Sequence, residues 1–194
     1  MDRMQMIALA VLAAFYGCYF LKMFRQRQRG IQTDQIGKGK TGFVKGVEVT
    51  MKIATFLVPL VELVSIFLRT TAFPQPVRIC GAVIGVLGAA VFITSVVTMR
   101  DSWRAGVSKT DKTELVTDGI YQISRNPAFL GFDLVYIGIL LMFFNPVLFA
   151  VSAFAALMFH LQIVNVEEDF LIETFGQAYL DYRKKVCRYL GRKR

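Results

Sequence analysis

Five apolar segments constrain this chain more than any other feature of its sequence. They cover residues 5–24, 53–68, 79–99, 128–144 and 147–164, and a helix of about 20 such residues spans the roughly 30 Å hydrocarbon layer of a bilayer. The composition agrees, because 55% of the residues are hydrophobic and only 19% are charged, unlike an average soluble protein. The sequence predicts an all-α, polytopic membrane protein with about five transmembrane helices.

Lysine and arginine are concentrated in alternate connections between these segments. Eight lie in residues 22–52, five in residues 100–125 and seven in residues 183–194, whereas the second connection holds only Arg69 and Arg78. Short cytoplasmic loops of membrane proteins carry such an excess. We therefore expect an integral, multi-pass membrane protein with its N-terminus outside and its C-terminus in the cytoplasm.

The net charge of +9 raises the question of a nucleic-acid partner. The basic residues lie beside apolar segments, however, where each favours anionic lipid headgroups by about 1 kcal/mol. The chain also lacks the recognition motifs of nucleic-acid-binding modules. Its three cysteines, Cys18, Cys80 and Cys187, have no metal-binding spacing. We expect membrane lipid as a partner, no nucleic acid and no metal.

The last two apolar segments are joined by only Asn145 and Pro146, which predicts a tight antiparallel helical hairpin. A polar, turn-rich stretch, residues 115–131, runs into this hairpin, and a carboxylate pair, Glu167 and Glu168, follows it. The hairpin should bring the loop and the carboxylates together at the cytoplasmic end of the two helices.

The tail that follows has the pattern of an amphipathic helix. Between residues 166 and 190 the apolar side chains recur at steps of three and four, and the basic residues cluster late. Such a helix is expected at the cytoplasmic membrane surface. Gly176 is expected to interrupt it, because glycine costs about 1 kcal/mol within a helix.

The loop and the carboxylate pair suggest a binding site. The guanidinium of Arg125 offers a fixed fork of donors for a carboxylate or phosphate, and Glu167 or Glu168 could accept the hydroxyls of a ribose. A structural interpretation explains the same residues: Arg125 as an interfacial cation, the glutamates as ordinary charges, and Pro127 as the first residue of a helix. These residues alone leave both interpretations open.

Three separated blocks resemble a known enzyme family. They are "SWRAGVS" (102–108), "ELVTDGIYQISRNPAFLG" (114–131) and "EEDFLIETFGQAYLDYRKKVCRYL" (167–190), and in order and spacing they are similar to the isoprenylcysteine carboxyl methyltransferase and phospholipid methyltransferase family of integral membrane enzymes. The resemblance covers about residues 80–190. It implies S-adenosylmethionine as methyl donor, bound in a cytoplasmic pocket, and a lipophilic methyl acceptor.

The resemblance also assigns roles to individual residues. The residues implied to bind the cofactor are Leu115, Val116, Gly119, Tyr121, Arg125, Asn126, Pro127, Gly131, Glu167 and Glu168. Arg125, Glu167 and Glu168 are in addition the implied catalytic residues. Asn126 stands where the family often has histidine, and Phe129 where it often has tyrosine, so no imidazole or phenol role is expected at these two positions.

For the acceptor, an isoprenylcysteine-type carboxylate or a phospholipid amine, we expect contacts with Glu62, Trp103, Arg104 and Tyr136. Glu62 lies in the middle of an apolar segment, where an ionisable group is expensive and normally functional. A structural role, in which it pairs with Tyr136 or His160, is equally open.

We expect an N-terminal two-helix membrane region with a basic cytoplasmic loop, residues 1–75, and a methyltransferase-like membrane core that holds the cofactor pocket, residues 76–194. Two other functions fit a chain of this kind. One is an NADPH-dependent membrane enone or sterol reductase, although a 2′-phosphate would favour more basic residues than Arg125 alone in the loop. The other is a non-catalytic, lipid-binding scaffold.

Overall fold

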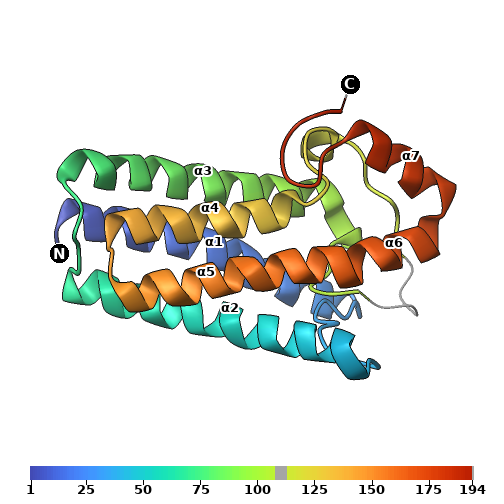
Figure 1. Ribbon diagram of the computed structural model, residues 1–194, viewed down its shortest axis with the longest axis horizontal. Helices are drawn as coiled ribbons and strands as arrows, with labels where there is room; N and C mark the ends of the chain where they lie inside the picture. Colours follow the sequence, from blue (N-terminus) through green and yellow to red (C-terminus); the bar gives the residue numbers. More distant parts are fainter. Residues whose placement is uncertain (108–112, 194) are drawn as a thin grey trace.

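The structure, a computed structural model, describes residues 1–107 and 113–193, which fold into helices joined by loops (Figure 1). The longer helices are α1 (Arg3–Gln28), α2 (Gly42–Leu68), α3 (Gln75–Met99), α4 (Pro127–Met142), α5 (Pro146–Gln162), α6 (Glu168–Phe175) and α7 (Gln177–Lys185). Short 3₁₀ helices lie at Arg100–Ser102 (η1) and Gly119–Gln122 (η2). The all-α prediction is confirmed.

Membrane-spanning length is reached by four helical stretches of the described chain, which are Arg3–Gln28, Gly42–Leu68, Gln75–Ser102 and Pro146–Phe175. The remaining predicted span, residues 128–144, corresponds to α4, which is apolar but shorter. These helices confirm a polytopic membrane protein. They run side by side, with the N-terminus and the α4–α5 turn at one end. Helix α7, the C-terminus and the loops that follow α1 and α3 gather at the other, here called the α7 end (Figure 1).

Helix α2 begins earlier than the apolar pattern predicts, at Gly42 instead of residue 53. Its added turns alternate apolar and polar residues, and Val47, Glu48 and Met51 all lie in the interior. Burial of this mixed face against other elements therefore extends the helix beyond the continuous apolar segment.

Helices α3 and α4 pack closely because glycines face one another between them. A Cβ atom on Gly138 would lie 2.5 Å from the Gly85 nitrogen and 2.7 Å from the Gly81 carbonyl oxygen. On Gly131 it would lie 2.8 Å from the Cβ of Phe92. Small residues of this kind allow helix backbones to approach within a membrane.

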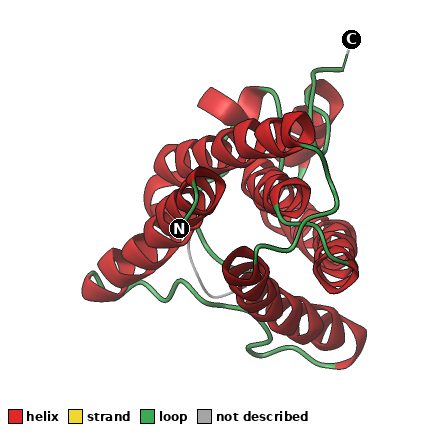
Figure 2. Ribbon diagram, turned by 90° about the vertical axis from the view of Figure 1, so that its left-hand side faces the viewer, coloured by secondary structure: helices red, strands yellow, loops and turns green. Residues whose placement is uncertain are grey.

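The predicted hairpin is present, with α4 and α5 joined by residues 143–145. The Asn145 side chain caps α5 by accepting a hydrogen bond from the Leu148 nitrogen at 2.9 Å, and its amide donates to Ser65 Oγ at 2.7 Å. After the turn the two helices pack against different neighbours, α4 against α3 and α5 against α2. The end view in Figure 2 shows the resulting ring of helices.

The tail forms two helices instead of one. Helix α5 continues through a π-helical turn, Ile163–Glu167, into α6. Gly176 then ends α6 with a φ of 53°, a conformation that favours glycine, and α7 starts in a new direction (Figure 1). The expected interruption at Gly176 is confirmed.

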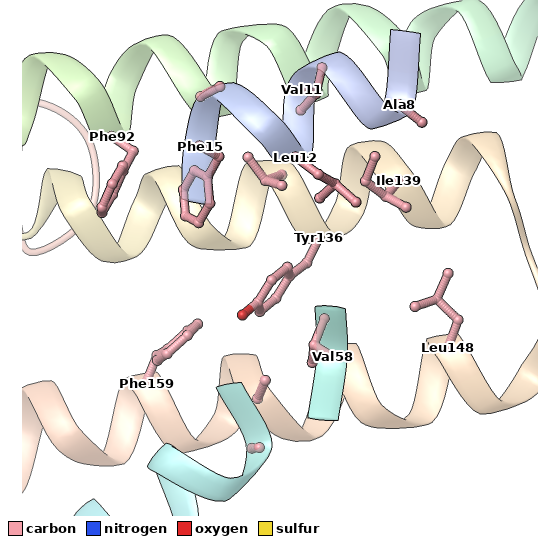
Figure 3. Packing of buried hydrophobic residues seen from close by; sticks show 14 of the residues in the cluster. Ala8, Val11, Leu12, Phe15, Val58, Phe92, Tyr136, Ile139, Leu148 and Phe159 are labelled. Atoms are coloured by element: carbon pink, nitrogen blue, oxygen red, sulfur yellow. The ribbon is translucent and has the colours of Figure 1, made fainter. Parts of the chain in front are cut away.

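Aromatic side chains fill much of the core. The rings of Phe15 and Phe92 lie 4.4 Å apart, and those of Tyr136 and Phe159 stack at 6.1 Å. Figure 3 shows Tyr136 projecting from α4 toward Val58 and Phe159, which come from the opposite pair of helices. Helix α2 packs on α5, and α1 packs on α3. The two predicted regions, residues 1–75 and 76–194, therefore share one core. The boundary between them near residue 75 stays a prediction.

Candidate functional site

A cavity of about 670 Å³ lies within the bundle and reaches the α7 end. Its inner part is lined by side chains in the middle of four helices, namely Tyr16, Phe56, Pro59, Leu63, Phe132 and Phe159. Its outer part is lined by the loops 102–107 and 113–116 and by residues of α6 and α7. The cavity therefore joins an apolar interior at membrane depth to a polar rim.

Arg125 is the most constrained polar residue of this rim. Its side chain is 4% exposed, lies 3.1 Å from Glu168 Oε1 and donates a hydrogen bond of 2.6 Å from Nη1 to the Tyr179 hydroxyl. Its Nε is buried and has no hydrogen-bond partner among the described residues. Arg125 also lines the cavity, which makes it a candidate for contact with a ligand that carries an anionic or carbonyl oxygen.

Glu168 is held by a second arginine, from the C-terminal segment. Arg188 donates from Nε to Glu168 Oε1 at 2.7 Å and from Nη2 to Oε2 at 3.1 Å, a two-point contact that only arginine makes. This contact raises the pKa of the Arg188 guanidinium. Glu168 thus neutralises part of the charge of two arginines and fixes the orientation of Arg125.

The backbone of the C-terminal segment completes the same site. The Arg125 nitrogen donates to the Cys187 carbonyl at 3.1 Å, and the Gly191 nitrogen donates to the Ile123 carbonyl at 2.7 Å. The Asn126 side chain donates to the Arg188 carbonyl at 3.0 Å. Residues 186–191 therefore clamp the loop before α4, an interaction that no helical periodicity in the tail could reveal.

Tyrosines attach α7 to the other side of the loop. The Tyr182 hydroxyl donates to the Tyr121 carbonyl at 2.6 Å, and the Tyr121 hydroxyl shares a hydrogen bond of 2.7 Å with Ser95 Oγ of α3. Burial raises the pKa of Tyr121, Tyr179 and Tyr182, so all three phenols stay neutral and can donate at physiological pH.

Most of the predicted cofactor and acceptor residues come together in this cavity. Those that line it are Leu115, Val116, Tyr121, Arg125, Asn126, Pro127, Glu167, Trp103 and Arg104. Gly119 has a φ of 56° and approaches Thr98, whereas Gly131 lies in the contact between α3 and α4. These two glycines shape the surrounding structure, as Glu168 does.

The two neighbouring glutamates have different environments. Helical residues one apart point about 100° away from each other, so Glu167 lines the cavity while Glu168 faces Arg125 and Arg188. Glu167 interacts with Gln162 and with the fully buried Glu48. Glu48 accepts hydrogen bonds from the Gly37 nitrogen and the Lys40 ammonium, whereas Glu167 is the carboxylate of the two that lines the cavity.

The first basic loop also contributes to the rim, which the sequence did not indicate. The Gln35 nitrogen donates to the Ala105 carbonyl at 2.8 Å, and the Ala105 nitrogen donates to the Thr33 carbonyl at 3.0 Å. This pairing places Asp34 and Ile36 in the cavity wall.

Trp103 and Arg104, predicted to contact the acceptor, lie beside this pairing. The ring of Trp103 packs edge to face on Tyr19 at 5.5 Å. The backbone carbonyl of Trp103 accepts a hydrogen bond from the Gln26 side chain at 3.0 Å. Arg104 donates from Nη1 to the same carbonyl at 2.9 Å.

Glu62 and Tyr136 are fully buried and lie deeper in the bundle. Of the two partners considered for Glu62, Tyr136 is close enough to interact electrostatically with it. His160 instead contacts the Tyr189 hydroxyl through Nδ1 at 2.5 Å.

The region that builds this site matches a known family. The family described as phospholipid methyltransferase matches residues 76–178, more than half of the chain. The chain belongs to the phospholipid methyltransferase family. The match includes the loop before α4, the hairpin and both glutamates, and it confirms the resemblance found in the sequence.

Relatives of this phospholipid methyltransferase family member include three proteins named protein-S-isoprenylcysteine O-methyltransferase. The one from Saccharomyces cerevisiae is 31% identical over 137 residues, 69% of this chain and 55% of its own length. That of Dictyostelium discoideum is 37% identical over 78 residues, 40% of this chain and 33% of its own. Form B from Arabidopsis thaliana is 29% identical over 103 residues, 52% of each chain. The matched part thus spans one third to about half of these relatives.

Proposed function

We propose that this protein is an integral membrane methyltransferase that moves a methyl group from S-adenosylmethionine to a lipophilic acceptor. The observation that carries the proposal is a cavity that joins a polar rim to an apolar interior at membrane depth. A water-soluble donor and a membrane-embedded acceptor could meet there. Family membership and the names of the relatives support methyl transfer over the reductase alternative.

The rim residues fit such a donor. Arg125 has one unsatisfied buried donor, Nε, that suits the carboxylate of an amino acid. Glu167 lines the same cavity and suits an ammonium group or the hydroxyls of a ribose. Leu115, Val116 and Tyr121 provide apolar and aromatic walls. When bound, S-adenosylmethionine would supply a methyl group on a positively charged sulfur.

The chain's own residues would promote transfer mainly by position. An in-line displacement needs the accepting atom about 3 to 3.5 Å from the methyl carbon, and exclusion of water removes competing hydration of the accepting group. The loops 102–107 and 113–116 cover the rim and would exclude water. A carboxylate acceptor needs no general base, and the O-methyltransferase names of the relatives favour such an oxygen acceptor over an amine.

The acceptor would enter from the membrane. Phe56, Pro59 and Leu63 of α2 line the inner cavity, and proline within a helix removes a backbone hydrogen bond and bends the helix. An isoprenyl or acyl chain would occupy this apolar part while its reactive end lies near Arg125 and Glu167. Trp103 and Arg104 lie on the same wall.

We further propose that the α7 end faces the cytoplasm and the N-terminus the outside. The described residues of all three basic segments found in the sequence meet at the α7 end (Figure 1). In a variant without native cysteines, a membrane-impermeant maleimide added to intact cells should label Thr71→Cys. It should label Arg192→Cys only after permeabilisation. The reverse pattern would contradict this orientation.

Titration calorimetry in detergent tests the donor site. S-adenosylhomocysteine should bind the wild type, and Glu167→Gln should weaken binding about tenfold, the equivalent of about 1.4 kcal/mol. Asp169→Asn is the matched control, because this carboxylate is two residues away and does not line the cavity. Methyl transfer from labelled S-adenosylmethionine to N-acetyl-S-farnesylcysteine then tests the reaction. Binding of NADPH without S-adenosylhomocysteine would instead establish the reductase.

A further inference from the structure

Three polar side chains meet deep in the bundle, beyond the rim. We call Tyr16, Glu62 and Tyr136 the inner polar cluster. Glu62 is fully buried and Tyr136 is 1% exposed. Both carboxyl oxygens and both phenol oxygens are buried without a hydrogen-bond partner of regular geometry among the described residues.

The members of this cluster come from three helices but lie close together. Glu62 of α2 interacts electrostatically with Tyr16 of α1 and with Tyr136 of α4, and the two phenols interact with each other. Figure 3 shows the Tyr136 hydroxyl pointing into the interior between α4 and the opposite helices. Apart from the contact between the two phenols, the hydrogen-bonding capacity of the cluster, above all that of the Glu62 carboxyl, is unused among the described residues.

The inner polar cluster adjoins the cavity. Tyr16 lines it directly, and so do Pro59 and Leu63, which flank Glu62 in α2. Phe132, one helical turn before Tyr136, lines it as well. Glu62 and Tyr136 themselves lie behind this wall. A ligand that fills the inner cavity would thus contact Tyr16 and lie beside the residues that flank Glu62.

Burying hydrogen-bonding groups without partners opposes folding, and the penalty is larger inside a membrane, where water does not compensate. A ligand that supplies the partners would remove this penalty. We propose that the inner polar cluster binds a hydroxyl or carbonyl oxygen in the chain of the acceptor lipid, remote from the methylated end, with Glu62 as the residue that determines this specificity. The inference rests on the proposed methyltransferase function.

The position of Glu62 sets the length of such an acceptor. Glu48 of α2 lies 3.3 Å from Gln162 and next to Glu167, at the rim. At a rise of 1.5 Å per residue, Glu62 lies roughly 21 Å further along the same helix. The second polar group would therefore lie near the far end of a long isoprenoid or acyl chain.

A neutral oxygen function fits the cluster better than an ammonium group. The carboxyl and the phenols are hydrogen-bond donors as well as acceptors, so together they can both donate to and accept from a hydroxyl. A lipid cation would have to lose its hydration at this depth, which is far more costly than burying a hydroxyl.

Two matched acceptors test the inference: N-acetyl-S-farnesylcysteine and its analogue with a hydroxyl at the far end of the farnesyl chain. Binding of each is measured by calorimetry in detergent, and methyl transfer to each is measured separately. The wild type should bind the hydroxylated analogue about tenfold more tightly. Glu62→Leu should abolish this preference and still bind the plain farnesyl compound.

Three further variants serve as alternatives to Glu62→Leu and as a control. Tyr136→Phe should weaken the preference, which keeps the test valid if Glu62→Leu does not fold, and Glu62→Gln should retain part of it. Tyr19→Phe is the matched control, because this α1 tyrosine also lines the cavity but has Asp34 and Trp103 of the rim as neighbours, and it should leave the preference intact. Retained binding of S-adenosylhomocysteine verifies the fold of each variant.

The outcomes separate the inference from the proposed function. Equal affinities for the two compounds in the wild type, or a preference that survives in Glu62→Leu, would overturn the inference even if both compounds are methylated. A preference that depends on Glu62 without any methyl transfer would overturn the function alone. Failure of folded protein to bind either compound would overturn both.

Discussion

At the scale of single residues, the site depends on Arg125, whose orientation is set by partners from the tail. Glu168 and Tyr179 contact its guanidinium, and Arg188 holds Glu168. A buried charge keeps its position only when its partners are also fixed. Arg188 is thus a positioning residue that acts through Glu168.

We therefore expect Arg188→Ala to lower the free energy of unfolding by about 1.5 to 3 kcal/mol, the range for hydrogen bonds to charged groups. It should also weaken binding of S-adenosylhomocysteine. Thermal unfolding and calorimetry in detergent measure the two effects. Lys184→Ala, which removes an exposed ion pair with Asp181, should change stability by less than about 0.5 kcal/mol. Equal effects of the two substitutions would contradict the role of Arg188.

Because three phenols are buried, we expect the protein to lose thermal stability in alkali. Burial raises the pKa of Tyr121, Tyr179 and Tyr182 above the ordinary value, so the unfolded chain loses these protons first, from about pH 10. The contribution of the three neutral phenols to the free energy of unfolding is therefore complete below about pH 10 and is lost as the pH rises further. The melting temperature should fall on the order of a few degrees more between pH 9 and 10.5 in the wild type than in Tyr182→Phe. Parallel curves for the two proteins would refute this.

At the scale of elements, the α3–α4 contact decides how closely the loop before α4 approaches α3. Gly85 and Gly138 touch backbone to backbone, so any side chain there forces the helices apart. The loop that carries Arg125 continues directly into α4. The distance of this loop, which includes η2, from α3 thus depends on glycines in the middle of the bundle.

Gly138→Ala should accordingly destabilise the protein by about 1 to 3 kcal/mol, as overpacking does. Gly17→Ala in α1 is the control, since a Cβ atom there meets nothing within 4 Å, and it should be neutral or stabilise by up to about 1 kcal/mol. Thermal unfolding distinguishes the two. A Gly138→Ala variant as stable as Gly17→Ala would show that the helices separate without penalty.

At the scale of the whole molecule, the chain closes on itself at the α7 end. The basic loop after α1 pairs with Ala105, the segment 186–191 clamps the loop before α4, and α7 covers Tyr121. Segments from both halves of the sequence therefore enclose one cavity.

Removing the residues after Lys185 should separate the membrane bundle from the site. The bundle should remain helical, because its core lies among α1 to α5, whereas binding of S-adenosylhomocysteine should fall at least tenfold. Circular dichroism and calorimetry measure the two properties. Unchanged binding by the shortened chain would show that the clamp does not support the site.

The sequence by itself determined the helical class, the approximate membrane spans, the hairpin, the break at Gly176 and the loop that lines the cavity. These properties follow from local patterns: runs of apolar residues, turn residues and a motif of fixed spacing. It could not separate Glu167 from Glu168, or connect Arg188, Asp34 and Ile36 to the site. Those assignments depend on the direction of each side chain and on contacts between distant segments, which only close packing of the whole chain defines.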